Sequence, residues 1–198
     1  MDAEPHDVPS AGEIRIRAAT IGEPDRLDGV IELKVYDPQW PVQYVIEAER
    51  VRAVLGRRAL RVEHVGSTSV PGLAAKPIID MLLIVADSSS ESDYVPPMED
   101  AGYTLRIREP DWYEHRLFKG PLANINLHVF SAGCPEIARM IDFRDHLRAD
   151  AGDRDLYQRT KQELAARQWH YVQDYADAKT EVIEAIVARA SRPQSAAQ

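Results

Sequence analysis

Residues 64–80, HVGSTSVPGLAAKPIID, combine the residue types that a phosphate-binding loop needs. Gly66 and Gly72 can adopt positive φ angles, which lets the backbone approach a ligand closely. Between these glycines, consecutive backbone N–H groups can point at an anion; they belong to Ser67, Thr68 and Ser69. Lys76 follows as a positive charge for the same anion. The loop lacks the Gly-Lys-Ser ending of a P-loop and the spacing of a dinucleotide fingerprint, so it predicts a phosphate site of another kind.

A carboxylate follows the loop in an otherwise apolar segment. Asp80 stands in PIIDMLLIV, a run typical of a strand buried on both faces. An ionised carboxylate is costly there unless a metal ion, a cation or hydrogen bonds receive it. The alternatives are a structural ion pair with Lys76 or Arg61, and a plain tight turn at the glycines. Because the loop, the lysine and the carboxylate fall within fifteen residues, we interpret them as one ligand site.

The surrounding elements place this loop at the end of a sheet. RALRVEH before it and PIIDMLLIVAD after it have the composition of strands. Further strands are expected at 30–37, 103–109, 115–120 and 124–130, one short strand within 13–29, and helices at 38–56 and before Gly102. After Pro135 the chain has no proline up to residue 190, and Gly152 is its only breaker there. The fold class is therefore α+β, with a mixed sheet followed by a helical C-terminal third.

The composition predicts one domain and excludes some partners. The chain has 198 residues, 44% of them hydrophobic, which suits a single core. We expect a domain at 29–190, a flexible or partly ordered N-terminal segment at 1–28 and a flexible tail at 191–198. The net charge of -8 argues against a general affinity for nucleic acid. A nucleotide or a phosphorylated small molecule, bound at a local basic pocket, remains the expected partner.

The sequence also predicts the compartment. The N-terminus is acidic and contains prolines, so it resembles neither a signal peptide nor a membrane span. Cys134 is the only cysteine, which excludes a disulfide within the chain and suits a reducing compartment. We therefore expect a cytoplasmic protein without a membrane partner.

Two similar segments in the helical third place lysines at a regular spacing. YQRTK at 157–161 and YADAK at 175–179 each carry a lysine four residues after a tyrosine. Lys161 and Lys179 are 18 residues apart, which is five turns of an α-helix. On an unbroken helix both lysines would share one face. The alternative is a pair of solvated lysines whose stems cover the neighbouring tyrosines.

Several stretches together resemble the GrpB-like family: VYDPQWP, EHVGSTSVPGLAAKPIIDMLLIV, LHVF, FRDHLR and YQRTKQELA. The resemblance covers about residues 31 to 188. The fold of that family resembles the nucleotidyltransferase superfamily of the DNA polymerase beta type. The resemblance therefore implies a nucleotidyltransferase-like mixed sheet with helices.

The superfamily pattern can be compared with this chain residue by residue. Its site begins with Gly-Ser, continues with Asp-x-Asp on a strand and adds a third carboxylate on a neighbouring strand. Gly66, Ser67 and Asp80 are in register with this pattern. Residue 82 is Leu where the second carboxylate should project, and the neighbouring strand offers His128 in place of the third. The resemblance thus implies a Mg²⁺ site held by Asp80 and His128, with fewer carboxylates than the superfamily uses.

The family pattern adds further polar residues to the candidate site. His64 and His128 are candidate proton carriers. A phosphate-facing basic wall would consist of Arg144, Lys161 and Lys179, opposite the glycine-serine loop. Arg144 has the local alternative of pairing with Asp142 or Asp145.

Three hypotheses of function follow. The first is an enzyme that transfers a nucleoside monophosphate from a Mg-bound triphosphate to a small acceptor and releases pyrophosphate. The second is a non-catalytic module of the same fold that binds a nucleotide or phosphorylated metabolite, for which Leu82 is the chief argument. The third, a structural adaptor, leaves Asp80 and Lys76 unexplained.

Overall fold

The computed structural model describes residues 10–122 and 124–190. Within these ranges the helices are α1 (Ala11–Ala19), α2 (Gln39–Leu55), α3 (Val95–Asp100), α4 (Pro135–Ala149), α5 (Ala151–Ala165), α6 (Val172–Asp177) and α7 (Thr180–Ala190). The strands are β1 (Arg26–Gly29), β2 (Arg61–Val65), β3 (Ile79–Val85), β4 (Thr104–Glu109), β5 (His115–Lys119), β6 (Ile125–Ser131) and β7 (Trp169–Tyr171). The predicted α+β class is confirmed.

A mixed sheet forms the centre of the described chain. Its strand order is β2-β3-β6-β5-β4, and β1 pairs with β7 in a separate two-stranded sheet. Only β3 and β6 run parallel, and the other neighbours are antiparallel. Asp80 therefore has Val65 of β2 on one side and Asn126 of β6 on the other. The N-terminal ends of β3 and β6 meet the C-terminal ends of β2 and β5 at one end of the sheet.

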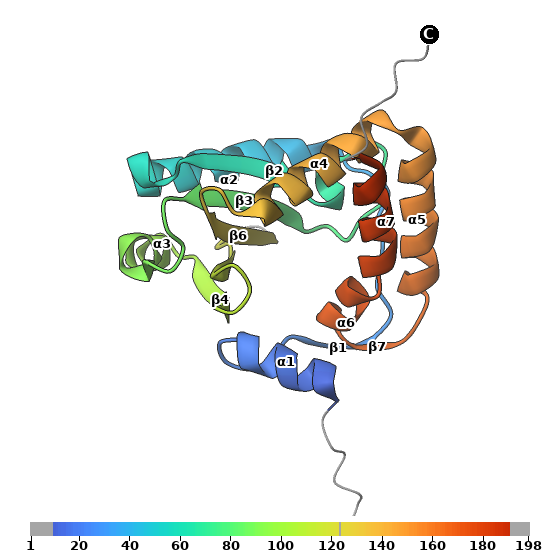
Figure 1. Cartoon of the computed structure of the whole chain (residues 1–198), viewed down its shortest axis with the longest axis horizontal. Helices are drawn as coiled ribbons and strands as arrows, with labels where there is room; N and C mark the ends of the chain where they lie inside the picture. The colour runs from blue at the N-terminus through green and yellow to red at the C-terminus, as the bar shows by residue number, and fades with distance from the viewer. Residues whose placement is uncertain (1–9, 123, 191–198) are drawn as a thin grey trace, which may run out of the picture.

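Helices cover both faces of this sheet (Figure 1). Helices α2 and α3 pack on the face that holds the largest apolar cluster, to which β3 contributes Ile79, Met81 and Leu83. Helix α4 covers the opposite face, where Leu82 and Ile84 pack with residues of α4. Helices α5, α6 and α7 stand beside the sheet (Figure 1). Asp80 alternates with Met81 along β3, so it lies on the α4 face.

The N-terminal region differs from the sequence prediction in two places. Residues 13–29 were expected to hold a short strand followed by a turn, but α1 forms over the first part, capped by Ser10, whose Oγ accepts from the N–H of Glu13, and the short strand β1 lies at the end of this range. Residues 30–37 were expected to form a strand, but they make only an isolated bridge from Lys34 to Ala75. Apolar alternation misled in both cases because Ile16 and Ile31 are buried against neighbouring elements and not in a ladder.

The helical third is interrupted, in contrast to the expectation. Asp150 ends α4 and caps α5 by accepting from the N–H of Asp153, while Gly152 lies inside α5. The chain then leaves helix after Ala165 and forms β7. Residues 10–28 contribute α1 and β1, and the remainder of the predicted flexible ends, 1–9 and 191–198, lies outside the described residues. No helix within the described ranges is long and apolar enough to cross a membrane.

Candidate functional site

The glycine-serine loop is held in place by contacts with helices α4, α5 and α7. Its Val70 and Leu73 are fully buried in a cluster with residues of α4, α5 and α7. The Arg148 guanidinium donates to the carbonyl of Ser69 at 2.8 Å. The N–H of Ala74 donates to Gln158 at 3.1 Å. The loop is therefore a rigid link between the sheet and the helices, as a preorganised binding loop must be.

Gly66 brings this loop against the carboxylate of Asp80. Gly66 has a φ of +68°, and a Cβ placed on it would lie 2.5 Å from Oδ2 of Asp80. Glycine is thus required both by the backbone conformation and by the close approach. Asp80 keeps 30% of its side chain exposed. The start of the loop and the strand carboxylate are therefore in direct contact.

We expect Gly66→Ala to displace the Asp80 carboxylate and to lower the free energy of unfolding by about 1–3 kcal/mol. Gly72→Ala is the matched control, because Gly72 also has a positive φ of +79° but an added Cβ there meets nothing within 4 Å. Denaturant titration should show a cost for both variants, larger at Gly66. Equal costs together with unchanged ligand binding in both variants would contradict the role of Gly66.

Polar groups surround Asp80 on the sheet. Asn126 donates to its Oδ1 at 2.9 Å, and the ammonium of Lys119 donates to Asn126 at 2.8 Å. Nε2 of His128 lies 3.9 Å from the same Oδ1, too far for a hydrogen bond. Burial works to raise the pKa of Asp80, but a protonated His128, together with Asn126 and Lys76, outweighs it and holds that pKa below its usual value. Asp80 is therefore an ionised acceptor at neutral pH.

Lys76 and Lys179 lie near this carboxylate, and Lys161 lies near Lys179. Lys76 and Lys179 place their Nζ atoms 5.5 and 4.3 Å from the ring centre of Tyr175. Lys161 lies 4.9 Å from the ring centre of Tyr157 and donates to the carbonyl of Ala74. Lys179 interacts electrostatically with Lys76, with Asp80 and with Lys161. We call Lys76, Lys161 and Lys179 the lysine cluster.

Burial makes the lysine cluster hard to charge. Lys161 is only 2% exposed, and burial together with Lys179 lowers its pKa to about 7. Burial and the neighbouring Lys76 lower the pKa of Lys179 to about 8. Burial also lowers the pKa of Lys76, although Asp80 opposes this shift. Desolvated like charges held together are destabilising unless an anion joins them, so the cluster has the properties of an anion site.

Two tyrosines complete the wall around the lysine cluster. Tyr157 is buried, and its hydroxyl interacts with Ser67. Tyr175 is 1% exposed, and its hydroxyl has no hydrogen-bond partner among the described residues. Burial raises the pKa of Tyr175 to about 12, so its hydroxyl is a donor at neutral pH. A buried donor without a partner is unusual in native proteins and is explained when a ligand or water accepts from it.

Some residues predicted for the site serve the fold around it. His64 faces α2 and stacks on Tyr44 with 4.8 Å between ring centres, and its Nε2 is 3.1 Å from the Thr68 hydroxyl. Burial lowers the pKa of His64 to about 4. The Thr68 hydroxyl donates to the carbonyl of Ile78, and the Ser69 hydroxyl donates to that of Gly66. The side chains of His64, Thr68 and Ser69 are thus engaged by other protein groups, and Asp80 acts on His64 only electrostatically.

Arg144 is also separated from the lysine cluster. Its guanidinium binds Asp145 at 2.7 Å, Glu63 at 2.7 Å and the carbonyl of His64 at 2.9 Å. The side chain is buried, and these contacts join α4 to the end of β2. The local alternative of pairing with Asp145 is thus realised. The basic wall predicted from Arg144, Lys161 and Lys179 contains the two lysines, with Lys76 in place of the arginine.

Leu82 occupies the position of the missing second carboxylate. It is fully buried and packs with Val65, Ile84 and Phe130 under α4. In the β3–β6 ladder Leu82 pairs with His128, just as Asp80 pairs with Asn126. The described residues near Asp80 therefore offer one carboxylate, one amide and one imidazole at this end of the sheet.

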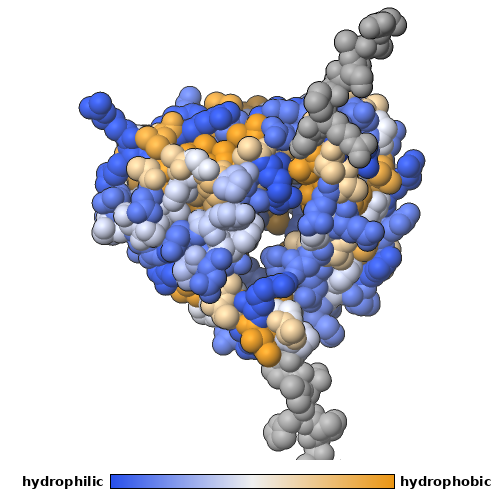
Figure 2. Space-filling view, viewed as in Figure 1, coloured by the Kyte–Doolittle hydropathy of each residue, from blue (hydrophilic) through white to orange (hydrophobic). Residues whose placement is uncertain are grey.

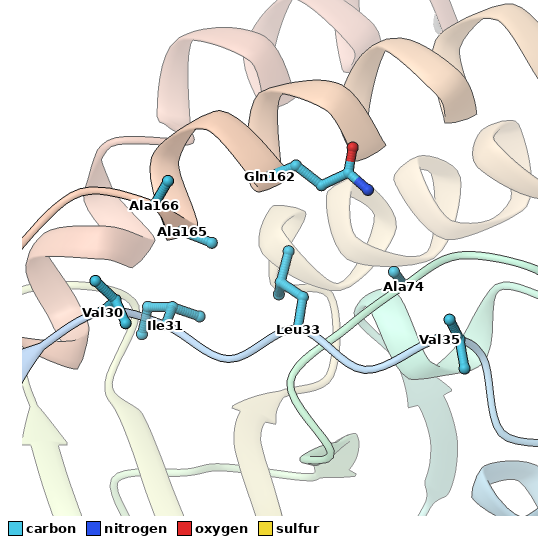
Figure 3. A pocket seen from close by; sticks show the side chains of 8 residues that line it. All are labelled: Val30, Ile31, Leu33, Val35, Ala74, Gln162, Ala165 and Ala166. Atoms are coloured by element: carbon cyan, nitrogen blue, oxygen red, sulfur yellow. The ribbon is translucent and has the colours of Figure 1, made fainter.

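The molecular surface is hollowed between the sheet and the helical part. Figure 2 shows this hollow near the middle of the face, with mostly hydrophilic residues around it. A different, apolar pocket of about 390 Å³ lies between residues 30–35 and α5 (Figure 3). Gln162 is its one polar side chain, and the other lining residues are aliphatic. The apolar pocket therefore lacks the groups that chemistry on a phosphate would need.

Sequence reasoning did not find several residues that the structure places at the site. These are Asn126, Lys119, Tyr157, Tyr175 and His115. Asn126 and Lys119 could have been found from the predicted neighbouring strands once their register was known. The tyrosines precede the two lysines by four residues, so the repeated Tyr-x-x-x-Lys pattern was the available signal.

Comparison with known proteins agrees with this structure. Residues 30–189 match the family model described as GrpB protein. The UPF0157 protein BH1888 of Halalkalibacterium halodurans is 58% identical over 176 residues, which is 89% of this chain and 90% of that protein. The crystal structure of the conserved protein GrpB from Enterococcus faecalis has a TM-score of 0.68 and 30% identity, and the match covers 80% of this chain and 96% of that chain.

A more distant likeness concerns the fold alone. The crystal structure of the Cid1 poly(U) polymerase with Mg and 3'-dATP bound has a TM-score of 0.50 at 10% identity. The match covers 67% of this chain and 44% of that chain. The predicted nucleotidyltransferase-like fold is thereby confirmed.

Proposed function

The chain belongs to the GrpB family, and from the geometry of its site we propose that it binds a nucleoside triphosphate with Mg²⁺ and transfers the nucleoside monophosphate to a small acceptor. The observation that carries the proposal is the proximity of Lys76 and Lys179 to Asp80 and to the ring of Tyr175, with Lys161 beside Lys179. A carboxylate for a divalent ion beside cations for phosphates is the arrangement that a metal-nucleotide requires.

The donor set fits one divalent ion. Asp80 has an oxygen, Oδ2, that faces Gly66 and accepts no hydrogen bond from the described residues, while Asn126 holds Oδ1. Mg²⁺ prefers oxygen ligands and commonly uses one or two carboxylates together with waters and phosphates. Asp80 would hold the ion, which when bound neutralises phosphate charge and makes the α-phosphorus more electrophilic. Leu82 offers no second carboxylate, so the substrate phosphates would supply the remaining ligands.

The other residues act on the phosphates and on one proton. The lysine cluster binds the phosphates and becomes fully protonated beside them. Tyr175 donates its free hydroxyl to the same anion, and Ser67 lies at the mouth of the loop near Tyr157. His128 takes the proton of the acceptor hydroxyl at Nε2, which faces the Asp80 side and makes no hydrogen bond there. His64 is not used, because its Nε2 is already engaged with Thr68.

The single cysteine fits a reducing compartment, so the proposal places this activity in the cytoplasm. The net charge of -8 favours a small acceptor over a nucleic acid.

Turnover of a nucleoside triphosphate labelled at its α-phosphate tests the transferase directly. The expected result is Mg²⁺-dependent release of pyrophosphate, with the label appearing on an acceptor present in a metabolite mixture. Thermal shift with each nucleotide identifies the base preference, since a ligand at a hundred times its dissociation constant adds about 2.7 kcal/mol of stability.

A second candidate function is a non-catalytic module of the same fold that binds a nucleotide or phosphorylated metabolite. Leu82 favours it, because a full two-metal mechanism uses more carboxylates than this site offers. Tight nucleotide binding with no turnover of the labelled triphosphate, in any acceptor mixture, would decide for this module.

A further inference from the structure

A chain of hydrogen bonds runs from the surface to His128. Oε2 of Glu109 is 2.7 Å from Nδ1 of His115, and Nε2 of His115 is 3.0 Å from Nδ1 of His128. Nε2 of His128 then lies 3.9 Å from Oδ1 of Asp80. Glu109 stands on β4, His115 on β5 and His128 on β6, so the chain crosses three neighbouring strands.

The rings in this chain are held in place by packing. His115 is 3% exposed, stacks on Phe130 with 4.8 Å between ring centres, and lies nearly parallel to the ring of His128, whose centre is 5.2 Å away. Trp112 packs edge-on against His115 at 5.1 Å. An imidazole enclosed in this way has little freedom to rotate, and burial lowers its pKa although Glu109 opposes the shift.

When both rings are neutral, only one placement of the two ring protons satisfies every hydrogen bond along the chain. An ionised Glu109 only accepts, so the proton of His115 must be on Nδ1. Nε2 of His115 is then an acceptor, and the proton shared with His128 must belong to Nδ1 of His128. Nε2 of His128 is left with its lone pair, on the side that faces Asp80.

From this geometry we propose that Glu109 and His115 are positioning residues that fix His128 in the Nδ1–H tautomer, with the Nε2 lone pair directed at the candidate site. The control of the His128 tautomer does not depend on the proposed function. Only its effect on catalysis rests on that function. A carboxylate that orients a histidine through its Nδ1–H is the same physical device as the acid of a serine-protease triad, with one additional imidazole between the two groups.

The tautomer is measured directly by nitrogen NMR on protein labelled at the histidine ring nitrogens, without metal or nucleotide, at a pH where the rings are neutral. We expect a protonated Nδ1 and an unprotonated Nε2 at His128. His115→Leu removes the acceptor and should release His128 to the Nε2–H form that free neutral histidine favours. His115→Gln, whose side-chain carbonyl can accept, should preserve the Nδ1–H form.

Substitutions at partly exposed positions provide a second test in case the substitution of the buried His115 unfolds the protein. Glu109→Ala removes the first acceptor from a side chain that is 30% exposed and should leave His128 as a mixture of tautomers. Glu114→Ala is the matched control, because Glu114 carries a carboxylate in the turn between β4 and β5 and contacts the side chain of Arg116. An Nε2–H form of His128 in the native protein, or an unchanged tautomer in folded Glu109→Ala, would overturn the proposal.

The catalytic consequence gives a second readout. If the transferase activity exists, His115→Leu should lower kcat by 10²-fold or more and change the nucleotide dissociation constant less than twofold, because general-base catalysis contributes 10²–10⁴-fold. Absence of any turnover in the native protein would refute the proposed function while the NMR result for His128 still stands. An unchanged kcat in a variant with the altered tautomer would overturn the catalytic role.

Discussion

Asp80→Asn should abolish the cooperation between Mg²⁺ and nucleotide in binding to this protein. In the native protein we expect Mg²⁺ alone to change stability little, because one carboxylate holds the ion weakly, and nucleotide with Mg²⁺ to stabilise clearly. The asparagine keeps an oxygen that can accept from Asn126 but lacks the charge that the ion needs. The measurement is calorimetric titration of nucleotide with and without Mg²⁺.

The same substitution should have the opposite effect without metal. Removal of the negative charge leaves Lys76 and Lys179 without their anionic neighbour, so nucleotide alone should bind the variant at least as tightly as it binds the native protein. Asp155→Asn makes the same change of charge at an exposed position on α5 and is the control. If Mg²⁺ changes nucleotide affinity neither in the native protein nor in Asp80→Asn, Asp80 does not hold the metal ion.

The sequence points to a candidate site because two residues there conflict with their surroundings. Asp80 in an apolar strand and Gly66 before it have no ordinary role in a sheet, so both indicate a ligand. The loop ends at the sheet as expected, and the structure brings Gly66, Ser67, Lys76, Asp80 and His128 to one end of it. Local sequence carries this information because these residues lie close together along the chain or on adjacent strands.

The five-turn spacing of Lys161 and Lys179 does not explain why they lie near each other in the structure. On an unbroken helix the two lysines would share one face, yet β7 and α6 lie between Lys161 and Lys179 along the chain. They lie near each other because the chain reverses between α5 and α7, which also places Lys76 and Lys179 beside the ring of Tyr175. A reversal of this kind depends on tertiary packing that spacing alone does not encode.

Residues of ambiguous type could not be assigned from the sequence. His64 and His128 both stand in apolar strands, but the strand register directs His64 to the α2 face and His128 to the Asp80 face. Arg144 has acidic neighbours in sequence, and Glu63 on β2 completes its pairing. Which face a side chain occupies changes with a shift of one residue in register, so these roles required the structure.

Lys161→Met should separate ligand binding from stability. The variant removes a buried charge and nearly preserves the volume of the side chain, so we expect the fold to persist and nucleotide affinity to fall by about tenfold or more, since a charge-assisted contact to phosphate contributes about 1.5–3 kcal/mol. Lys34→Met is the control, because Lys34 is an exposed lysine paired only with Glu32. Titration of both variants with the same Mg-nucleotide measures the loss.

The pH dependence of stability gives the second half of this prediction. The pKa of Lys161 is about 7 in the folded protein and near 10.5 when the chain is unfolded, so the unfolded state binds more protons between these values. Native stability should therefore rise with pH across that window, by up to about 1.4 kcal/mol per pH unit from this group. The increase in stability is complete near pH 10.5, where Lys161 is neutral in both states. Below pH 7 Lys161 is charged in both states, and its burial lowers the stability by the full amount.

Lys161→Met should lose this slope, because methionine does not titrate. Relative to the native protein, the variant should become more stable as pH falls from about 10 to 7, while Lys34→Met should follow the native curve. Denaturant unfolding at several pH values measures the difference. Parallel curves for the native protein and Lys161→Met, combined with unchanged nucleotide affinity, would mean that Lys161 only anchors the carbonyl of Ala74. A flattened slope with weakened binding would mean that the chain keeps a destabilising charge because its ligand is an anion.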